Sequence, residues 1–317
     1  MQTISTLEPF SNPSAKRKLI ARQNFQRRLP LYMMLIPAGV GLFLFNYLPM
    51  AGLVMVFQNY KPLIGFFKSP FVGFGNFERA FALPGFWDLV RNTLVIASGK
   101  IILGQVVSLI FALLLHEVTR PLFKRSIQTI TYALYFLSWI VFGGLMLEVL
   151  GANGLFNQML ALVNIGPVDF LTDSSIFSFT LIGTDIWKNF GMGAVLYLAA
   201  LADVDVQLYE AAAMDGANRW DRLWHVTLPG IAPTITILFC LNLGFLLDAG
   251  MQQILVLYNP VVYSTGDVLS TFVYRIGLTS NQFSLAATVG MMQSAVGFIL
   301  IILSYYLARR LANYRIF

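Results

Sequence analysis

Six stretches of this chain are apolar over the length of helix that crosses the hydrocarbon core of a bilayer, which is roughly 20 residues. Apolar residues make up 57% of the 317 residues and charged residues only 11%, so there are too few charges to coat a soluble globule. We therefore predict an all-α integral membrane protein with six transmembrane helices. Pro37 and Pro49 predict a kink in the first one. The six stretches are 31–56, 92–115, 127–150, 176–200, 231–257 and 284–308.

Lysine and arginine residues are divided unevenly between the two sides that six spans define. The side richer in these residues is the cytoplasmic one, so we predict that both termini and segment 201–230 are cytoplasmic and that 57–91, 151–175 and 258–283 face outward. This clustering also argues against nucleic-acid binding, despite the net charge of +6. The side of the two termini carries 14 lysine and arginine residues: Lys16, Arg17, Lys18, Arg22, Arg27, Arg28, Arg120, Lys124, Arg125, Arg219, Arg222, Arg309, Arg310 and Arg315. The other side carries 5: Lys61, Lys68, Arg79, Arg91 and Arg275.

The spans form one integral domain, 29–308, between a basic N-terminal tail, 1–28, and a C-terminal tail, 309–317. We expect the N-terminal tail to be flexible or an interfacial arm, and to be retained, because the first apolar run is too long for a cleavable signal. The single Cys240 is expected to be a small buried hydrophobe. No metal site is expected, since His116 and His225 lack further ligands at a suitable spacing.

Segment 201–230 has the pattern of two short helices joined by a tight turn. Good helix formers fill 205–214, Asp215-Gly216 is a strong break, and Asn218 with Asp221 three residues later approximates a capping pair. Pro229 is predicted to end the second helix. Trp220, Leu223 and Trp224 share one face of it. On periodicity alone, an amphipathic loop that anchors the spans explains the segment equally well.

The string Glu210-Ala211-Ala212-Ala213-Met214-Asp215-Gly216-Ala217, followed by Leu228-Pro229, resembles the EAA loop of binding-protein-dependent permeases of type I ATP-binding-cassette (ABC) importers. The resemblance implies that 201–230 docks on an ATPase subunit as a coupling helix. Glu210 would pair with a basic group there, Ala211 and Ala212 would allow close approach, and Gly216 would permit the turn. The implied coupling residues are Glu210, Ala211, Ala212, Asp215, Gly216, Ala217, Arg219, Leu228 and Pro229.

Other motifs resemble the carbohydrate branch of that family, and specifically permeases for alginate or pectin fragments. They are Phe71-Val72-Gly73-Phe74-Gly75-Asn76-Phe77, Asn92-Thr93-Leu94, Leu257-Tyr258-Asn259-Pro260, Asp267-Val268-Leu269 and Tyr274-Arg275-Ile276-Gly277-Leu278. One departure is Gly250-Met251-Gln252-Gln253, where the branch often has Gly-Phe-Glu-Gln; it removes a carboxylate. The implied partners are a second homologous permease, two ATPase subunits, an outside solute-binding protein and a carbohydrate substrate.

Polar residues within the spans are functional candidates by default, because ionisable groups at membrane depth are costly. Asp185 and Lys188 lie three apart and are expected to pair, structurally or at a ligand site. Asn242, Asp248, Gln252 and Gln253 are expected to form a polar stripe on the fifth span, either for interhelical hydrogen bonds or as a wall of a sugar path. Aromatic residues could supply faces for a sugar. The substrate-path candidates are Asp185, Trp187, Lys188, Asn242, Asp248, Gln252 and Gln253; the candidates for contact with the solute-binding protein are Tyr258, Asn259, Tyr263 and Arg275.

The chain itself is not expected to be an enzyme. Its nearest match to a phosphate-binding loop, Ser98-Gly99-Lys100-Ile101, lacks the upstream glycine and the hydroxyl residue. ATP and magnesium are therefore expected on partner subunits, with none in this chain. The alternative to a permease is a membrane-anchored scaffold or sensor that docks a cytoplasmic partner through 201–230 without transport. A secondary carrier is a third class, for which the internal symmetry is lacking.

Overall fold

The computed structural model describes the backbone of residues 13–312 and the side chains of residues 28–310. The chain divides into two compact units, 1–54 and 55–317. Most of the two predicted tails, 1–28 and 309–317, lies outside the residues whose side chains are described. The backbone of 13–28 belongs to the first helix, α1 (Pro13–Leu42).

The described part of the first unit, 13–54, is one long helical segment, basic up to Arg28 and apolar after it. After α1 the hydrogen-bonding pattern changes to a π-helical turn at Phe43–Tyr47 and then to a 3₁₀ helix at Leu48–Phe57. Pro37 lies inside α1, and Pro49, which has no N–H to donate, lies in the 3₁₀ part. The stretch Arg28–Phe57 is long and apolar enough to cross a membrane, as predicted for 31–56.

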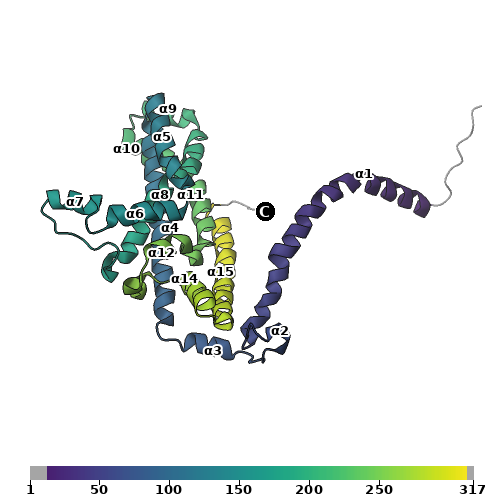
Figure 1. Ribbon diagram of the computed structural model, residues 1–317. Coiled ribbons are helices and arrows are strands. Elements are labelled where there is room, and N and C mark those ends of the chain that lie inside the picture. The colour runs from purple at the N-terminus through teal and green to yellow at the C-terminus, as the bar shows by residue number, and fades with distance from the viewer. Residues whose placement is uncertain (1–12, 313–317) are drawn as a thin grey trace, which may run out of the picture. The chain divides into compact units, whose positions relative to one another are not determined.

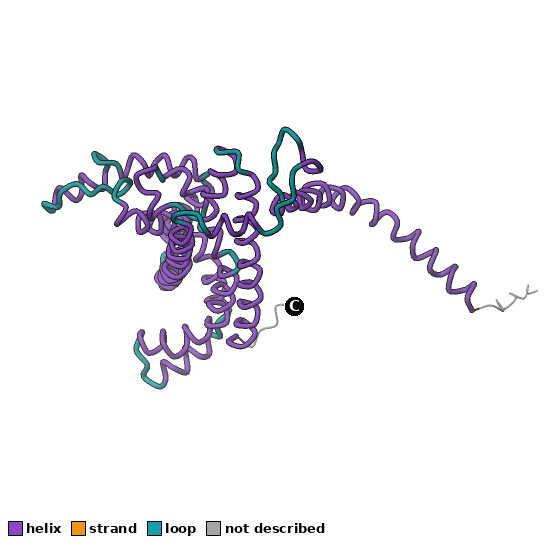
Figure 2. Tube along the Cα trace, turned by 90° about the horizontal axis from the view of Figure 1, so that it is seen from below, coloured by secondary structure: helices purple, strands orange, loops and turns teal. Residues whose placement is uncertain are grey.

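The second unit is a bundle of helices (Figure 1). Among residues 13–312 the only β-type pairing is an isolated bridge between Gln58 and Phe71, and Figure 2 shows helices joined by loops throughout. The α-helices are α2 (Gly65–Lys68), α3 (Gly75–Phe81), α4 (Phe86–Glu117), α5 (Pro121–Phe136), α6 (Trp139–Leu150), α7 (Leu155–Leu162), α8 (Ser174–Ala202), α9 (Val206–Met214), α10 (Arg219–Arg222), α11 (Leu228–Leu243), α12 (Met251–Leu257), α13 (Tyr263–Gly266), α14 (Leu269–Tyr274) and α15 (Phe283–Ala312). Irregular helical turns lie at Leu223–Thr227 and Arg275–Thr279 (π) and at Leu246–Asp248 and Pro260–Val262 (3₁₀).

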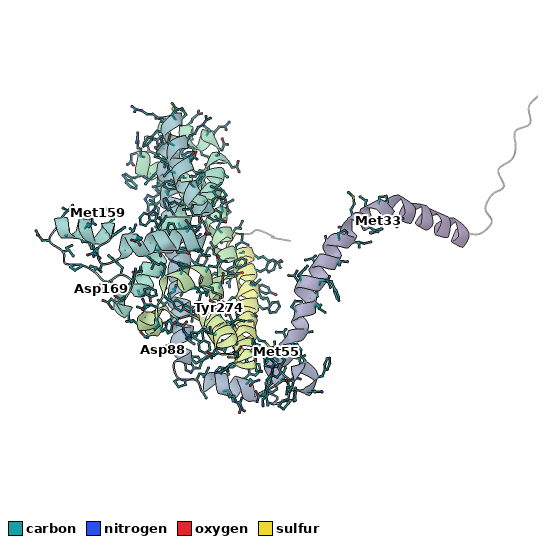
Figure 3. The ribbon with its side chains drawn as sticks, viewed as in Figure 1. Met33, Met55, Asp88, Met159, Asp169 and Tyr274 are labelled. Carbon is teal, nitrogen blue, oxygen red and sulfur yellow. The ribbon has the colours of Figure 1, made fainter. Side chains whose placement is uncertain are left out.

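The centre of the bundle is the packing of α4 against α8, with α11 beside both. Small residues permit the close approach: a Cβ at Gly193 of α8 would lie 2.5 Å from the Oγ of Ser108 on α4. A buried cluster joins the three helices near their ends, formed by Ala112, Ala194, Tyr197, Leu201 and Ile231. Asp88, in the first turn of α4, lies at the end of the bundle opposite α9 (Figures 1 and 3).

The number of spans agrees with the prediction. Five helical segments are long and apolar enough to cross a membrane, and α8 with α9, bent by 68°, makes a sixth. The stretches 92–115, 176–200 and 284–308 each lie within one helix, α4, α8 and α15.

For two of the predicted spans, the prediction of one continuous helix is wrong. The stretch 127–150 is interrupted between Phe136 and Trp139, because Ser138 turns out of the helix and its Oγ accepts from the N–H of Val141 to start α6. The stretch 231–257 is interrupted between α11 and α12. There Ala249 and Gly250 have φ angles of 50° and 78°, which no continuing right-handed helix allows.

Candidate functional site

The segment 201–230 folds as the predicted helix pair. Asp205 caps α9 by accepting from the N–H of Gln207 at 2.9 Å. Gly216 makes the turn with a φ of 78°, a conformation that favours glycine. Asn218 and Asp221 form a reciprocal capping box at α10: the Oδ1 of Asn218 accepts from the N–H of Asp221 at 3.1 Å, and an Oδ of Asp221 accepts from the N–H of Asn218 at 3.1 Å. The predicted break and cap are confirmed.

The predicted stop at Pro229 is wrong. The second helix runs from Arg219 through the π-helical turn Leu223–Thr227 into α11, and Arg219–Leu243 forms one span. Pro229 lies in the first turn of α11, where its missing N–H costs little. The widened turn before it, closed by the N–H of Leu228 on the carbonyl of Leu223, accommodates the proline without a break.

The helix pair presents an exposed surface and is fixed firmly to the bundle. Glu210 is exposed and makes no ion pair with the described residues. The same helix pair carries exposed apolar side chains, among them Leu208, Met214 and Trp220. On the inner side, the Tyr209 hydroxyl is 3.0 Å from the Thr227 Oγ1, which ties α9 to the π-helical turn. The other predicted coupling residues Ala211, Asp215, Gly216, Arg219 and Pro229 are exposed, and Ala212, Ala217 and Leu228 are half-buried.

A polar cavity of about 380 Å³ lies between α4, α8 and α11. Of the predicted path residues it contains Asp185 and Asn242. Sequence reasoning missed Lys100, although a lysine within an apolar span was itself a signal. It also missed that Lys100, Gly104 and Ser108 lie on one face of α4 at four-residue spacing. The lining residues are Lys100, Ile101, Gly104, Gln105, Ser108, Asp185, Ile186, Asn189, Phe190, Gly193, Leu196, Tyr197, Leu238 and Asn242.

Lys100 connects this cavity to the break in the fifth span. Its Nζ donates to the carbonyl of Ala249 at 2.7 Å and to the Oε1 of Gln253, and lies 3.8 Å from an Oδ of Asp185. Gln253, fully buried, donates from its Nε2 to the carbonyl of Leu181 and to the Thr184 Oγ1, both at 2.7 Å. The network therefore joins α4, α8 and α12.

The predicted pairing of Asp185 with Lys188 is wrong, because Asp185 is engaged by Lys100 from the neighbouring helix. Lys188 is buried and faces the break between α5 and α6, where its Nζ donates to the carbonyl of Tyr135 at 2.8 Å. It also lies 5.4 Å from the ring centroids of both Tyr135 and Trp139. A cation is favourable there, at the C-terminal end of α5.

The predicted polar stripe on the fifth span is also wrong, because the break divides its members. Asn242 is exposed to the cavity, whereas Gln253 is enclosed within the network. Asp248 and Gln252 are exposed and do not line the cavity. Trp187, also outside it, packs edge-on against Phe156 at 5.9 Å between ring centroids.

The four residues predicted to contact a solute-binding protein gather in one cluster. The rings of Tyr258 and Tyr263 lie 4.9 Å apart, and the Arg275 guanidinium lies 4.3 Å from the Tyr263 ring. Arg275 also donates to an Oδ of Asp267 at 2.5 Å. Asn259 donates to the carbonyl of Leu171 at 2.9 Å. Burial raises the pKa of Tyr258 to about 12. All four side chains are half-buried and held by internal contacts.

Two of the family-like motifs have an evident structural role. Asn76, buried in the phenylalanine-rich motif, donates to the carbonyls of Val56 and Gln58 at 2.8 and 2.9 Å. Asn92 donates to the carbonyls of Ser264 and Asp267 at 2.9 and 3.2 Å and so holds segment 258–283 against α4. That segment includes α14, which ends at Tyr274 (Figure 3).

The chain has the features of a multi-pass membrane permease: six helical segments long and apolar enough to cross a membrane, a polar cavity between α4, α8 and α11, and an exposed helix pair that follows α8 and leads into α11. Residues 104–313 match the family model described as "Binding-protein-dependent transport system inner membrane component", and the chain belongs to this family of ABC importer permeases.

Three proteins illustrate the similarity. The chain is 40% identical to Protein LplB of Bacillus subtilis over 281 residues, 88% of each chain. It is 37% identical to the polygalacturonan/rhamnogalacturonan transport system permease protein YteP of the same organism, over 93% of this chain and 92% of that one. Its structure resembles a crystal structure of a bacterial ABC transporter involved in the import of the acidic polysaccharide alginate, with a TM-score of 0.84, 33% identity, and coverage of 92% of this chain and 98% of the other.

Proposed function

We propose that this chain is one of two permease subunits of an importer for acidic oligo- or polysaccharides and forms half of the translocation path. Two of the three similar proteins are described by a polysaccharide: one by polygalacturonan and rhamnogalacturonan, the other by alginate, which is described as acidic. The polar cavity, with Lys100, Gln105, Asn189 and Asn242, offers hydrogen-bonding groups of the kind that sugar hydroxyls and carboxylates need.

One observation carries the proposal: the exposed helix pair is a continuation of two helices that line the cavity. α8 supplies Asp185, Asn189 and Tyr197 to the cavity and then bends by 68° into α9. α11 supplies Leu238 and Asn242 and is continuous with α10. A push on α10 would therefore reach the cavity wall through the helix that continues into α11, and a push on α9 would reach α8 across the bend at 203–205. This geometry is what coupling requires, and an anchored scaffold has no need of it.

The proposed complex contains a second homologous permease, two ATPase subunits that hold ATP and magnesium, and a solute-binding protein on the outer side. Both termini and segment 201–230 would lie in the cytoplasm, in line with the division of 14 basic residues against 5. ATP binding would close the ATPase subunits and move 201–230, the spans would open outward, and hydrolysis would reset the cycle. Tyr258, Asn259, Tyr263 and Arg275 stay candidates for the outer contact.

The test replaces Glu210 with alanine in the complex reconstituted into proteoliposomes. We expect membrane insertion to be retained, and both ATPase-subunit retention and uptake of labelled oligogalacturonate to be lost. Glu78→Ala is the matched control, because Glu78 is an exposed glutamate on α3, far along the chain from the helix pair. Unchanged uptake and unchanged ATPase binding in Glu210→Ala would exclude the coupling role.

The substrate class is tested separately in the unaltered complex with its solute-binding protein. Oligogalacturonate and alginate oligosaccharides should stimulate ATP hydrolysis, whereas neutral maltooligosaccharides of equal length should not. Stimulation by neutral sugars alone would contradict the acidic substrate and leave the permease function intact. Absence of any sugar-dependent uptake or hydrolysis would favour the scaffold.

A further inference from the structure

A second cavity, of about 440 Å³, lies between the end of α4 and the helix pair of 201–230. It shares no lining residue with the polar cavity described above. It is lined by the end of α4 and by the helix pair with its π-helical turn. The residues are Leu113, Leu114, His116, Glu117, Tyr209, Arg219, Trp220, Arg222, Leu223 and Thr227. Of these residues, only Arg219 is among those that the family resemblance implies for ATPase coupling.

The charge of this cavity is unbalanced. Arg219 and Arg222 make no ion pair with any acidic side chain among residues 28–310. The Nε of Arg222 is buried and has no hydrogen-bond partner there. A buried donor without a partner is costly, so a bound acceptor would relieve it. Glu117 is the one carboxylate among the lining residues, which leaves an excess of positive charge for one anionic group.

The remaining wall is apolar and belongs to the end of a helix that is predicted to cross the membrane. Leu113 and Leu114 belong to the last turns of α4, which is itself long and apolar enough to cross a membrane. Leu114 is 65% exposed and Trp220 69% exposed, and tryptophan concentrates at membrane interfaces. An inorganic anion would leave these apolar surfaces uncovered, whereas a molecule with a phosphate and acyl chains would cover them.

We propose that this cavity binds an anionic phospholipid of the cytoplasmic leaflet. Its phosphate lies between Arg219 and Arg222, and an acyl chain lies along Leu113 and Leu114. Basic pockets at span ends on the cytoplasmic side are sites of this kind. Glu117 disfavours a doubly charged phosphate and can accept from a hydroxyl, so a glycerol headgroup fits best. The orientation rests on the proposed function, but the chemistry of the site does not.

The first experiment uses the unaltered full-length chain, purified with its co-purifying subunits and placed in nanodiscs. Brominated phosphatidylglycerol should quench tryptophan fluorescence more than brominated phosphatidylcholine, and Trp220→Phe should remove the difference. Equal quenching by the two lipids would overturn the proposal. So would displacement of the brominated lipid by inorganic phosphate at equal concentration, because it would identify a simple anion site.

The second experiment measures phosphatidylglycerol affinity by native mass spectrometry for Arg219→Gln/Arg222→Gln. A basic residue near the membrane surface contributes about fivefold in affinity, so we expect a loss of about 25-fold. The control Arg120→Gln/Arg125→Gln removes two exposed charges, one just before α5 and one in its second turn, outside the cavity, and should retain the affinity. Equal losses in both double variants, or none in either, would contradict the site. If the cavity variant does not fold, the tryptophan quenching in the unaltered chain still tests the lipid site.

Discussion

Lys100 on α4 donates a hydrogen bond of 2.7 Å to the carbonyl of Ala249, in the break between α11 and α12. Ala249 has a φ of 50°, which a non-glycine residue adopts only when its surroundings hold it there. Lys100 therefore stabilises the irregular backbone that ends α11 next to the polar cavity. The lysine is largely buried, and Asp185 at 3.8 Å balances its charge.

The first prediction is that Lys100→Met destabilises the protein severely. Methionine keeps the length of the side chain but leaves the carboxylate of Asp185 without its cation and the carbonyl of Ala249 without its donor. Breaking a buried pair in this way costs about 3–5 kcal/mol. The measurement is the midpoint of thermal unfolding in detergent, which should fall by many degrees.

Lys61→Met is the matched control, because Lys61 is exposed and makes no ion pair with the described residues. Its midpoint should stay within a degree or two of the unaltered protein. An equally small change in Lys100→Met would show that the break does not depend on this lysine. The double variant Lys100→Met/Asp185→Asn should recover part of the loss, since it removes the uncompensated carboxylate.

The second prediction is that two adjacent glutamines, which sequence analysis assigned to the same polar stripe, differ in their contribution to stability. Gln253 is fully buried and bonds to Leu181, Thr184 and Lys100, whereas Gln252 is exposed. Gln253→Leu should lower the free energy of unfolding by about 1–3 kcal/mol, because Lys100 loses a buried acceptor. Gln252→Leu, the same chemical change one residue earlier, should have little effect. Similar unfolding midpoints in the two variants would contradict the enclosed network.

The parts of the fold that follow from local pattern were predicted from the sequence. The apolar runs of α4, α8 and α15 are uninterrupted, and the predicted spans 92–115, 176–200 and 284–308 lie within these helices. The Asn218–Asp221 cap needs only residues three apart, so its spacing is visible in the chain. The helix over 205–214 follows from a local pattern as well, whereas Glu210 was singled out by the family resemblance.

The breaks in two spans could not be predicted, because distant partners stabilise them. Ala249 is flanked by Asp248 and Gly250, but the lysine that holds the break is 149 positions away. The partner of Asp185 was missed for the same reason: Lys188 is near in sequence, but Lys100 is near in space. Pairing at membrane depth depends on which helices pack together, which one sequence does not specify.

The last prediction concerns Arg275, which the sequence alone suggests as a contact for a solute-binding protein. Its guanidinium pairs with the buried carboxylate of Asp267 and stacks on the Tyr263 ring. Arg275→Ala should therefore destabilise the protein by about 3–5 kcal/mol, as expected when one partner of a buried pair is removed. Arg79→Ala, at an exposed arginine on α3, should leave the unfolding midpoint nearly unchanged.

The double variant Asp267→Asn/Arg275→Gln distinguishes an internal role from a contact role. Removal of both charges avoids a buried unpaired carboxylate, so the unfolding midpoint should recover in part. If Arg275 acts only inside the protein, stimulation of ATP hydrolysis by the solute-binding protein should recover with it. If stability recovers but stimulation does not, Arg275 also contacts the binding protein.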